Sequence, residues 1–155
     1  MESDVLQRYK KLQTKFSLPH LTELEQTFKF EIEEKDELFD QIRHEMSDRV
    51  FSFTERIVEH LIGGPESLCC LYEQNMISTE EKQNLFQLYK KIQVLKWKNN
   101  MLLMNPDENK IAEWIKDAWI LWNDELQKEL NTTCKNLSSR WNDLKFKDDS
   151  TYYHG

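Results

Sequence analysis

Residues 78–104 read STEEKQNLFQLYKKIQVLKWKNNMLLM and contain no glycine or proline. Ser78 and Glu81 have the spacing of a capping box, in which two side chains satisfy free backbone N–H groups at a helix start. Apolar residues then recur every three or four positions, which is the periodicity of an amphipathic helix. The stretch therefore predicts one long helix that buries a face composed of Leu85, Leu88, Tyr89, Ile92, Leu95, Leu102 and Leu103.

The rest of the chain follows the same pattern, because only three glycines and three prolines occur in 155 residues. Helix-breaking residues and apolar periodicity predict further helices at 4–16, 21–28, 35–62, 65–74 and 106–146. In the long third helix the predicted apolar stripe is Leu38, Ile42, Met46, Val50, Phe53, Ile57 and Leu61. The sequence therefore predicts an all-α fold, an irregular antiparallel bundle of four main helices plus one or two short ones.

Local signals predict how these helices begin and end. Glycine tolerates left-handed backbone, so Gly63 and Gly64 are expected to end the third helix, with Pro65 as the first residue of the next. Asn105 is expected to cap the last helix, which then begins at Pro106. Thr22 and Glu25 have capping-box spacing near the second helix, and poor helix formers at 131–133 predict a kink.

Length and composition indicate one domain, residues 1–146, followed by a flexible polar tail at 147–155. A chain of this size buries roughly 70% of its unfolded surface, and its 12% aromatic content supplies core material. The first residues lack the apolar run of a secretory signal, and no segment is apolar enough to span a membrane. Three scattered cysteines suit a reducing compartment. We expect a cytoplasmic protein without contact with a membrane.

The net charge of −7 is unevenly distributed. Residues 82–106 contain five lysines and no acid. The lysines Lys90, Lys91, Lys96 and Lys98, together with Trp97, could hold phosphate and stack a base, which would make the chain an RNA- or ribosome-associated factor. A lysine-rich helix surface is more often only solvated, and the stretch contains no arginine.

The patterns that signal catalysis, a cofactor or a metal are missing from the sequence. One face of the third helix would gather Glu33, Glu37, Asp40, His44 and Asp48, but without the Glu-x-x-His repeats of carboxylate-bridged bundles this face is expected to be solvated. Cys69 and Cys70 point about 100° apart on a helix, so one thiol is expected to be buried and the other exposed. We therefore expect no enzyme, no cofactor and no metal.

A tryptophan-rich segment offers the other candidate surface. Trp114, Ala118 and Trp122 fall on one helix face, whereas Trp119 and Ile120 point elsewhere. A helix that is apolar on nearly all sides is either enclosed by neighbours or exposes a patch to a partner. Because tryptophan is enriched in binding hot spots, we expect Trp119 and Ile120 to contact a protein partner if they are exposed.

Several stretches resemble small all-helical proteins of archaeal genomes that are described only as uncharacterised. The similar stretches include Tyr9-Lys10-Lys11-Leu12, Leu18-Pro19-x-Leu21-x-Glu23-Leu24, Phe30-Glu31-Ile32-Glu33, Tyr72-Glu73, Phe86-x-x-Tyr89-Lys90-Lys91 and Trp114-Ile115. The resemblance implies a helical fold and no known activity. The sequence thus favours a non-catalytic intracellular interaction protein with an unidentified protein partner, and nucleic acid is the alternative partner.

Overall fold

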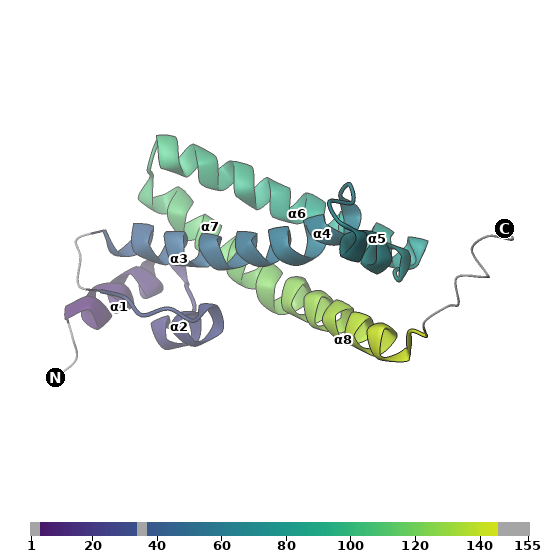
Figure 1. The fold of residues 1–155 in the computed structure, drawn as a ribbon. Helices are drawn as coiled ribbons and strands as arrows, with labels where there is room; N and C mark the ends of the chain where they lie inside the picture. The colour runs from purple at the N-terminus through teal and green to yellow at the C-terminus, as the bar shows by residue number, and fades with distance from the viewer. Residues whose placement is uncertain (1–3, 34–36, 146–155) are drawn as a thin grey trace, which may run out of the picture.

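The computed structural model describes residues 4–33 and 37–145. Every regular element in these two ranges is helical, and neither range contains a strand (Figure 1). The prediction of an all-α fold is therefore confirmed. The tail predicted at 147–155 and the predicted start of the third helix at residue 35 lie outside the described residues.

The described helices form six separate runs, two of which contain a wider π-helical segment. In chain order the elements are α1 (Asp4–Phe16), α2 (Leu21–Phe28), α3 (Leu38–Phe53), the π segment η1 (Thr54–Glu59), α4 (His60–Ile62), α5 (Leu68–Asn75), α6 (Thr79–Met104), α7 (Glu108–Leu121), the π segment η2 (Trp122–Leu126) and α8 (Gln127–Asp143). The predicted bounds of the first two helices and of residues 79–104 agree with the structure. The last helical run ends at Asp143 rather than at 146.

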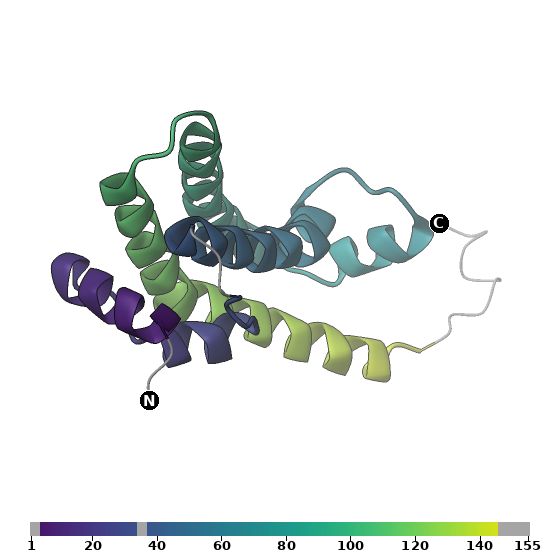
Figure 2. The ribbon, with the colours of Figure 1, turned by 90° about the vertical axis from the view of Figure 1, so that its left-hand side faces the viewer.

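Three long runs lie against one another in Figures 1 and 2. The run α3–η1–α4 goes from left to right in Figure 1, α6 returns, and α7–η2–α8 goes rightward again. Helix α3 contacts both α6 and α7, and α6 contacts α7. The short helices α1 and α2 pack at one end, where α1 contacts α7 and α2 contacts α3. Helix α5 lies at the opposite end of the molecule.

The two π segments explain how the core stripes remain buried along long helices. In α3–η1 the buried positions Ile42, Met46, Val50, Thr54 and Val58 are spaced by four. Each such step advances about 40° beyond one α-helical turn, so the stripe would rotate away from the core. The i→i+5 bonds of a π segment widen the turn and counter that rotation. Within the predicted stripe, Phe53 and Ile57 are only half-buried, although both pack against the core.

An aromatic cluster joins η2 to α2 and to Phe53, the last residue of α3. The Trp122 ring lies 5.5 Å from Phe28 and 5.9 Å from Phe53, measured between ring centroids. Tilted aromatic rings at this separation stabilise a fold by more than the burial of their surface alone. The irregularity of the last helix therefore falls at η2, where this cluster forms, and not at residues 131–133, where the sequence predicted a kink; those residues lie within α8.

The predicted end of the third helix at residue 62 is confirmed, whereas its predicted left-handed backbone and the predicted start of the next helix were wrong. Neither Gly63 nor Gly64 has a positive φ; left-handed backbone occurs instead at Ser17 (φ 55°) and at Lys29 (φ 57°), after α1 and α2. Pro65 lies in a loop, because Ser67 caps α5 by accepting a hydrogen bond from the Cys70 N–H at 3.1 Å. Polar side chains that can accept from the first free N–H groups decide where a helix begins.

A capping side chain also moves the start of α7, whereas α2 begins at Leu21 as predicted. Asp107, not Asn105, caps α7, since its carboxylate accepts from the Lys110 N–H at 3.1 Å. At α2 the N-cap is His20, whose backbone N–H donates to the Glu23 carboxylate at 3.2 Å. Thr22 and the rest of the predicted capping box therefore lie inside α2.

A buried guanidinium connects α3 to α6. Arg43 is 2% exposed and donates to the Asp40 carboxylate at 3.0 and 3.2 Å, and its third contact is the side-chain oxygen of Asn99 on α6. Asn99 is itself buried. A charged group buried among apolar side chains must be hydrogen-bonded, so this contact fixes how α6 is rotated against α3.

Asn99→Ala should remove one partner of the buried Arg43 and lower the free energy of unfolding by about 1–3 kcal/mol. Asn100→Ala on the next, partly exposed position is the matched control and should change it by about 0.5 kcal/mol or less. Urea denaturation followed by circular dichroism measures both. Equal stabilities for the two variants would contradict the role assigned to the Arg43 contact.

Gly63→Ala tests why glycine ends the α3–η1–α4 run. Gly63 is in extended backbone (φ −81°, ψ −173°), but an added Cβ would lie 2.6 Å from the Glu59 carbonyl oxygen. We expect a loss of about 1–3 kcal/mol in the free energy of unfolding from this overlap. Gly64→Ala meets no atom within 4 Å and should leave stability unchanged or slightly raised. Thermal denaturation of the two single variants gives the comparison.

Candidate interaction surface

Helix α6 turns one side fully into the molecule. Its buried residues are Leu85, Leu88, Ile92, Leu95, Asn99 and Leu102, and it contacts α3, η1, α4 and α7. The buried indole of Trp114 on α7 donates its N–H to the Leu95 carbonyl at 2.9 Å, which ties the two helices together. The predicted inner face was correct except at Tyr89, which is half-buried, and at Leu103, which is 58% exposed.

The opposite side of α6 also carries large apolar residues, and these face solvent. We call this set the α6 stripe; its exposed fractions are Phe86 50%, Val94 54%, Trp97 63%, Met101 57% and Met104 80%. At 100° per residue the five positions fall within an arc of about 80°, directly opposite the buried face. Lys90 lies in line with them. The longest helix of the structure therefore presents an apolar ridge with no described element packed over it.

A hollow of about 420 Å³ lies beside the C-terminal half of the stripe, between α6 and α7. Met101, Met104 and Leu102 line it from α6, and Trp114 lines it from α7. Apolar atoms make up most of this lining, and such hollows receive the anchoring side chains of binding partners. The stripe and the hollow form one continuous candidate surface.

The α7 side of the hollow carries Lys110, Glu113 and Asp117. Ile120 follows Asp117 by three residues and so shares the same helix face; it is 52% exposed. Trp119 is different: it is half-buried, with its ring 6.3 Å from Phe28 of α2. The sequence did not indicate that α2 would cover this flank. Ile120 remains a predicted contact on the accessible surface, and Trp119 contributes at most its exposed edge.

The predicted lysine cluster is divided by the helix geometry. Lys91 points toward η2 and pairs with Glu125. Lys90 lies within the stripe beside Trp97, whereas Lys96 and Lys98 diverge by about 100° to either side of it. Among the described residues, none forms an ion pair with Lys90, Lys96 or Lys98 within 4 Å. These three lysines border an apolar ridge, which differs from the compact basic patch expected of an RNA-binding face.

The α6 stripe was not predicted, although its spacing is visible in the sequence. Positions 86, 90, 94, 97, 101 and 104 advance by four and three residues, as the inner face does. A helix with two such faces leaves open which one is buried. The polar residue Asn99 on the inner face made the buried face harder to predict, because Asn99 is buried through its contact with Arg43 of α3.

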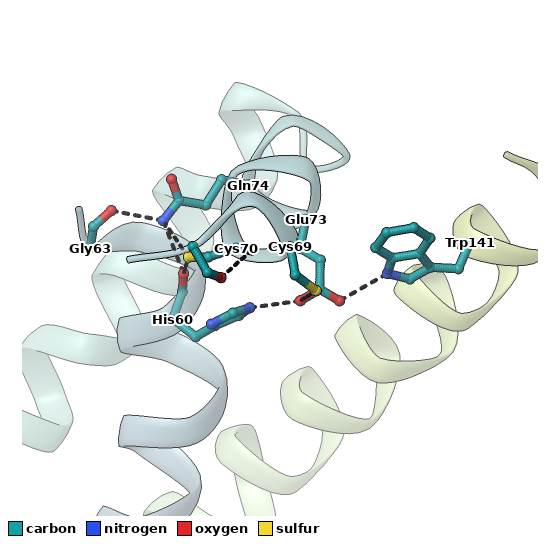
Figure 3. A network of polar contacts seen from close by, with 8 residues as sticks. His60, Gly63, Cys69, Cys70, Glu73, Gln74 and Trp141 are labelled. Carbon is teal, nitrogen blue, oxygen red and sulfur yellow. Dashed lines mark hydrogen bonds and ion pairs between the residues drawn. The ribbon is translucent and has the colours of Figure 1, made fainter. Parts of the chain in front are cut away.

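At the other end of the molecule, polar contacts hold α5 in place (Figure 3). The Glu73 carboxylate of α5 accepts from the His60 ring at 2.7 Å and from the Trp141 indole of α8 at 2.9 Å. The Gln74 amide donates to the carbonyl oxygens of His60 and Gly63 at 3.0 and 2.8 Å. Glu73 thereby joins α4, α5 and α8.

A second ion pair anchors α8 beside this cluster. The Arg140 guanidinium donates two hydrogen bonds to Glu81 at 2.8 and 3.0 Å, and a third to the Met76 carbonyl at 2.7 Å. Glu81 is also the acid of the capping box that begins α6. The predicted capping box of Ser78 and Glu81 is confirmed, and the further contact of Glu81 with Arg140 was not predicted.

The cluster around Glu73 has the residue types of a catalytic site but not the electrostatics. Cys69 lies 3.7 Å from the Glu73 carboxylate, while the His60 ring is paired with that carboxylate and not with the thiol. Local desolvation, together with the Glu73 charge, raises the pKa of the Cys69 thiol above its ordinary value. Nucleophilic cysteines typically have a lowered pKa, and the shift at Cys69 is in the opposite direction. Cys70 is buried and Cys69 exposed, as predicted.

The acidic stripe is largely solvated, as predicted. Glu33, Glu37, His44 and Asp48 are exposed, and Asp40 differs because it holds the buried Arg43. Across the described residues we find no set of three or more His, Cys, Asp or Glu side chains arranged to hold a metal ion. None of the described helices combines the length and apolar content needed to cross a bilayer.

No protein family, curated protein or solved structure matches this chain. The resemblance to uncharacterised archaeal helical proteins therefore stays a prediction. Any assignment of function depends on the surface and the contacts described above.

The charge on Glu73 should stabilise the α5 end in a pH-dependent way. Partial burial alone would raise the pKa of Glu73, but hydrogen bonds from Trp141 and His60 outweigh this and lower it. A lowered folded-state pKa contributes stability above the unfolded value, about 4.3, and that contribution is lost as pH falls through the folded pKa. The destabilisation caused by Glu73→Gln should therefore be present at neutral pH and shrink in acid.

Urea unfolding of wild type and Glu73→Gln at about pH 7 and about pH 3 measures this change. Glu45→Gln, at an exposed position of α3, is the matched control for removing one carboxylate charge. A destabilisation of Glu73→Gln that is the same at both pH values would show that the carboxylate charge has no such role.

Proposed function

We propose that this chain is a non-catalytic intracellular protein that binds other proteins through exposed helix faces, with the α6 stripe as its principal contact. The observation that supports this most is the exposure of five large apolar side chains in one line on the side of α6 opposite the core. Contiguous apolar surface on a folded chain is characteristic of an interaction site. Ile120, on the adjoining face of α7, is proposed as part of the same surface.

The packing supports a rigid presentation of this surface. Helix α6 is held by the Arg43–Asn99 contact, by the Trp114–Leu95 hydrogen bond and by the Lys91–Glu125 pair. We also propose that the fold is an irregular antiparallel bundle of four main helices. The contacts that support this are those of α3, α6 and α7 with one another and of α1 with α7. A preformed helix face lowers the entropic cost of association.

RNA or ribosome contact through Lys90, Lys91, Lys96, Trp97 and Lys98 is the second candidate. Its support is the exposed Trp97 ring beside lysines that have no acidic partner among the described residues. Against it stand the engagement of Lys91 with Glu125 and the divergence of Lys96 and Lys98. Three of the five stripe residues, Val94, Met101 and Met104, are neither basic nor aromatic and so cannot hold a phosphate or stack a base.

The double variant Trp97→Ser/Met101→Ser should lose the protein partners that co-purify with the wild-type chain. We expect recovery of a discrete set of proteins to fall at least about tenfold, since two central apolar contacts would be removed. The full chain is expressed with an affinity tag in cells of its own source, and recovery is quantified by mass spectrometry. Circular dichroism establishes that both chains are equally helical.

Leu68→Ser is the matched control, because Leu68 is 71% exposed on α5, at the opposite end of the molecule from the hollow. Its partner set should equal that of wild type. An unchanged partner set for the double variant would refute the stripe as the contact surface. If nuclease treatment alone removes the whole set, and binding to RNA is salt-sensitive, the RNA candidate replaces the proposal.

A further inference from the structure

We propose that the α6 stripe binds an amphipathic helix of another protein whose apolar face is bordered by acidic side chains, and that one apolar side chain of this helix enters the hollow between α6 and α7. This inference rests on the proposed function and specifies the partner. Its evidence is the spacing of the stripe, the position of the hollow and the charge of α6.

The spacing of the stripe matches what a second helix requires. The five stripe residues and Lys90 occupy positions 86, 90, 94, 97, 101 and 104, at intervals of four and three. We call this line of six positions the seam, because helices contact one another along positions spaced in this way. The seam extends over 18 residue steps, or about 27 Å. An amphipathic helix of about 20 residues would cover it with anchors at three- and four-residue intervals.

The hollow gives the partner helix a place for an anchoring side chain. It lies at one end of the stripe and is lined by the flexible side chains Met101 and Met104, with the buried indole of Trp114 in its lining. Methionine adapts its shape to an incoming apolar group, and an anchor that fills such a hollow dominates binding energy. A leucine or an aromatic side chain fits this chemistry.

The charge of α6 specifies what borders the partner's apolar face. Between Glu81 and Asp107 every charged residue is a lysine. Lys91 pairs with Glu125, and Lys82 precedes the first stripe residue, Phe86. Of the remaining lysines, Lys90 lies in line with the stripe, and Lys96 and Lys98 lie on its two sides. Acidic side chains on a bound helix would meet these three lysines, whereas basic ones would be repelled.

The same charges argue against a second copy of this chain as the occupant. Pairing α6 with another α6 would bring only lysines together, because this part of the helix offers no acid for a cross-pair. Like charges placed together along a helix seam weaken association. The rim of the hollow on α7 is mixed, with Lys110 beside Glu113 and Asp117, so the partner's acids would lie over α6 and its uncharged anchor over the hollow.

Two synthetic peptides of about 20 residues test this inference directly. Both are amphipathic helices with the same leucine seam, one flanked by glutamates and the other by lysines, and each carries a fluorophore for anisotropy titration with the full chain. The glutamate-flanked peptide should bind at least about tenfold more tightly, and its affinity should fall as salt is added.

A charge reversal on the protein supplies the decisive comparison. The double variant Lys90→Glu/Lys98→Glu should invert the preference, so that the lysine-flanked peptide binds more tightly. The matched control Lys128→Glu/Lys135→Glu reverses two exposed lysines of α8 and should keep the wild-type preference. Circular dichroism verifies that both variants remain folded.

Other results would contradict a partner helix with acidic borders. No binding of the glutamate-flanked peptide, equal affinity for both peptides, or a preference unaffected by Lys90→Glu/Lys98→Glu would overturn the acidic partner. Displacement of the bound peptide by single-stranded RNA at lower concentration than by unlabelled peptide would overturn it in favour of nucleic acid. A concentration-dependent dimer that Trp97→Ser/Met101→Ser abolishes would overturn it in favour of self-association.

This experiment separates the inference from the proposed function. If Trp97→Ser/Met101→Ser abolishes recovery of cellular partners but the peptides show no charge preference, the α6 stripe remains a protein contact and only the acidic chemistry fails. If cellular recovery is also unaffected by that variant, the proposed function fails with it.

Discussion

The arrangement of the long helices depends on the buried guanidinium of Arg43. A cation enclosed by apolar side chains is tolerated only when its N–H groups are hydrogen-bonded, and here the acceptors come from Asp40 one turn away and from Asn99 on α6. Large apolar residues lie on both the inner and the outer side of α6, so apolar residue type alone does not distinguish the two sides. The contact between Arg43 and Asn99 turns the side that carries Asn99 toward α3, and the α6 stripe therefore faces outward.

The two ends of the structure have opposite character. At the end that holds α5, hydrogen bonds to Glu73 and Glu81 join α4, α5, α6 and α8, and the polar groups there are occupied by one another. At the end where α6 meets α7, apolar side chains of α6 and the Trp114 indole line part of a hollow that also has charged residues on its α7 side. Polar contacts therefore join the helices at one end, whereas exposed apolar side chains of α6 lie beside a hollow at the other.

Sequence patterns predicted the helices well because capping and periodicity are local. The start of α6 at Ser78 depends only on side chains within one turn, and the bounds of α1 and α2 follow from neighbouring residues in the same way. Where the burial of a residue depended on a segment distant in the sequence, the prediction was wrong or none was made. Trp119 is half-buried because α2 covers it, and Asn99 is buried because Arg43 reaches it from α3.

The candidate surface was only partly predictable for the same reason. Lys90, Trp97 and Ile120 were identified from residue type, but Phe86, Val94, Met101 and Met104 have the composition of core residues. Their exposure follows from the rotation of α6, which no local pattern encodes. Likewise, position 63 suits a glycine because a Cβ there would lie too close to the Glu59 carbonyl oxygen, and not because of an unusual φ angle.

The π segments η1 and η2 have a consequence for how this chain tolerates changes in length. Each holds one residue more than an α-helix needs to connect the same two flanking segments. Deleting a residue within Thr54–Glu59 or within Trp122–Leu126 would let the segment close into ordinary α-helix while the flanking helices keep their rotational phase. Homologues that are one residue shorter at either place could therefore retain the same core, whereas a deletion within α6 would turn the outer ridge toward the interior.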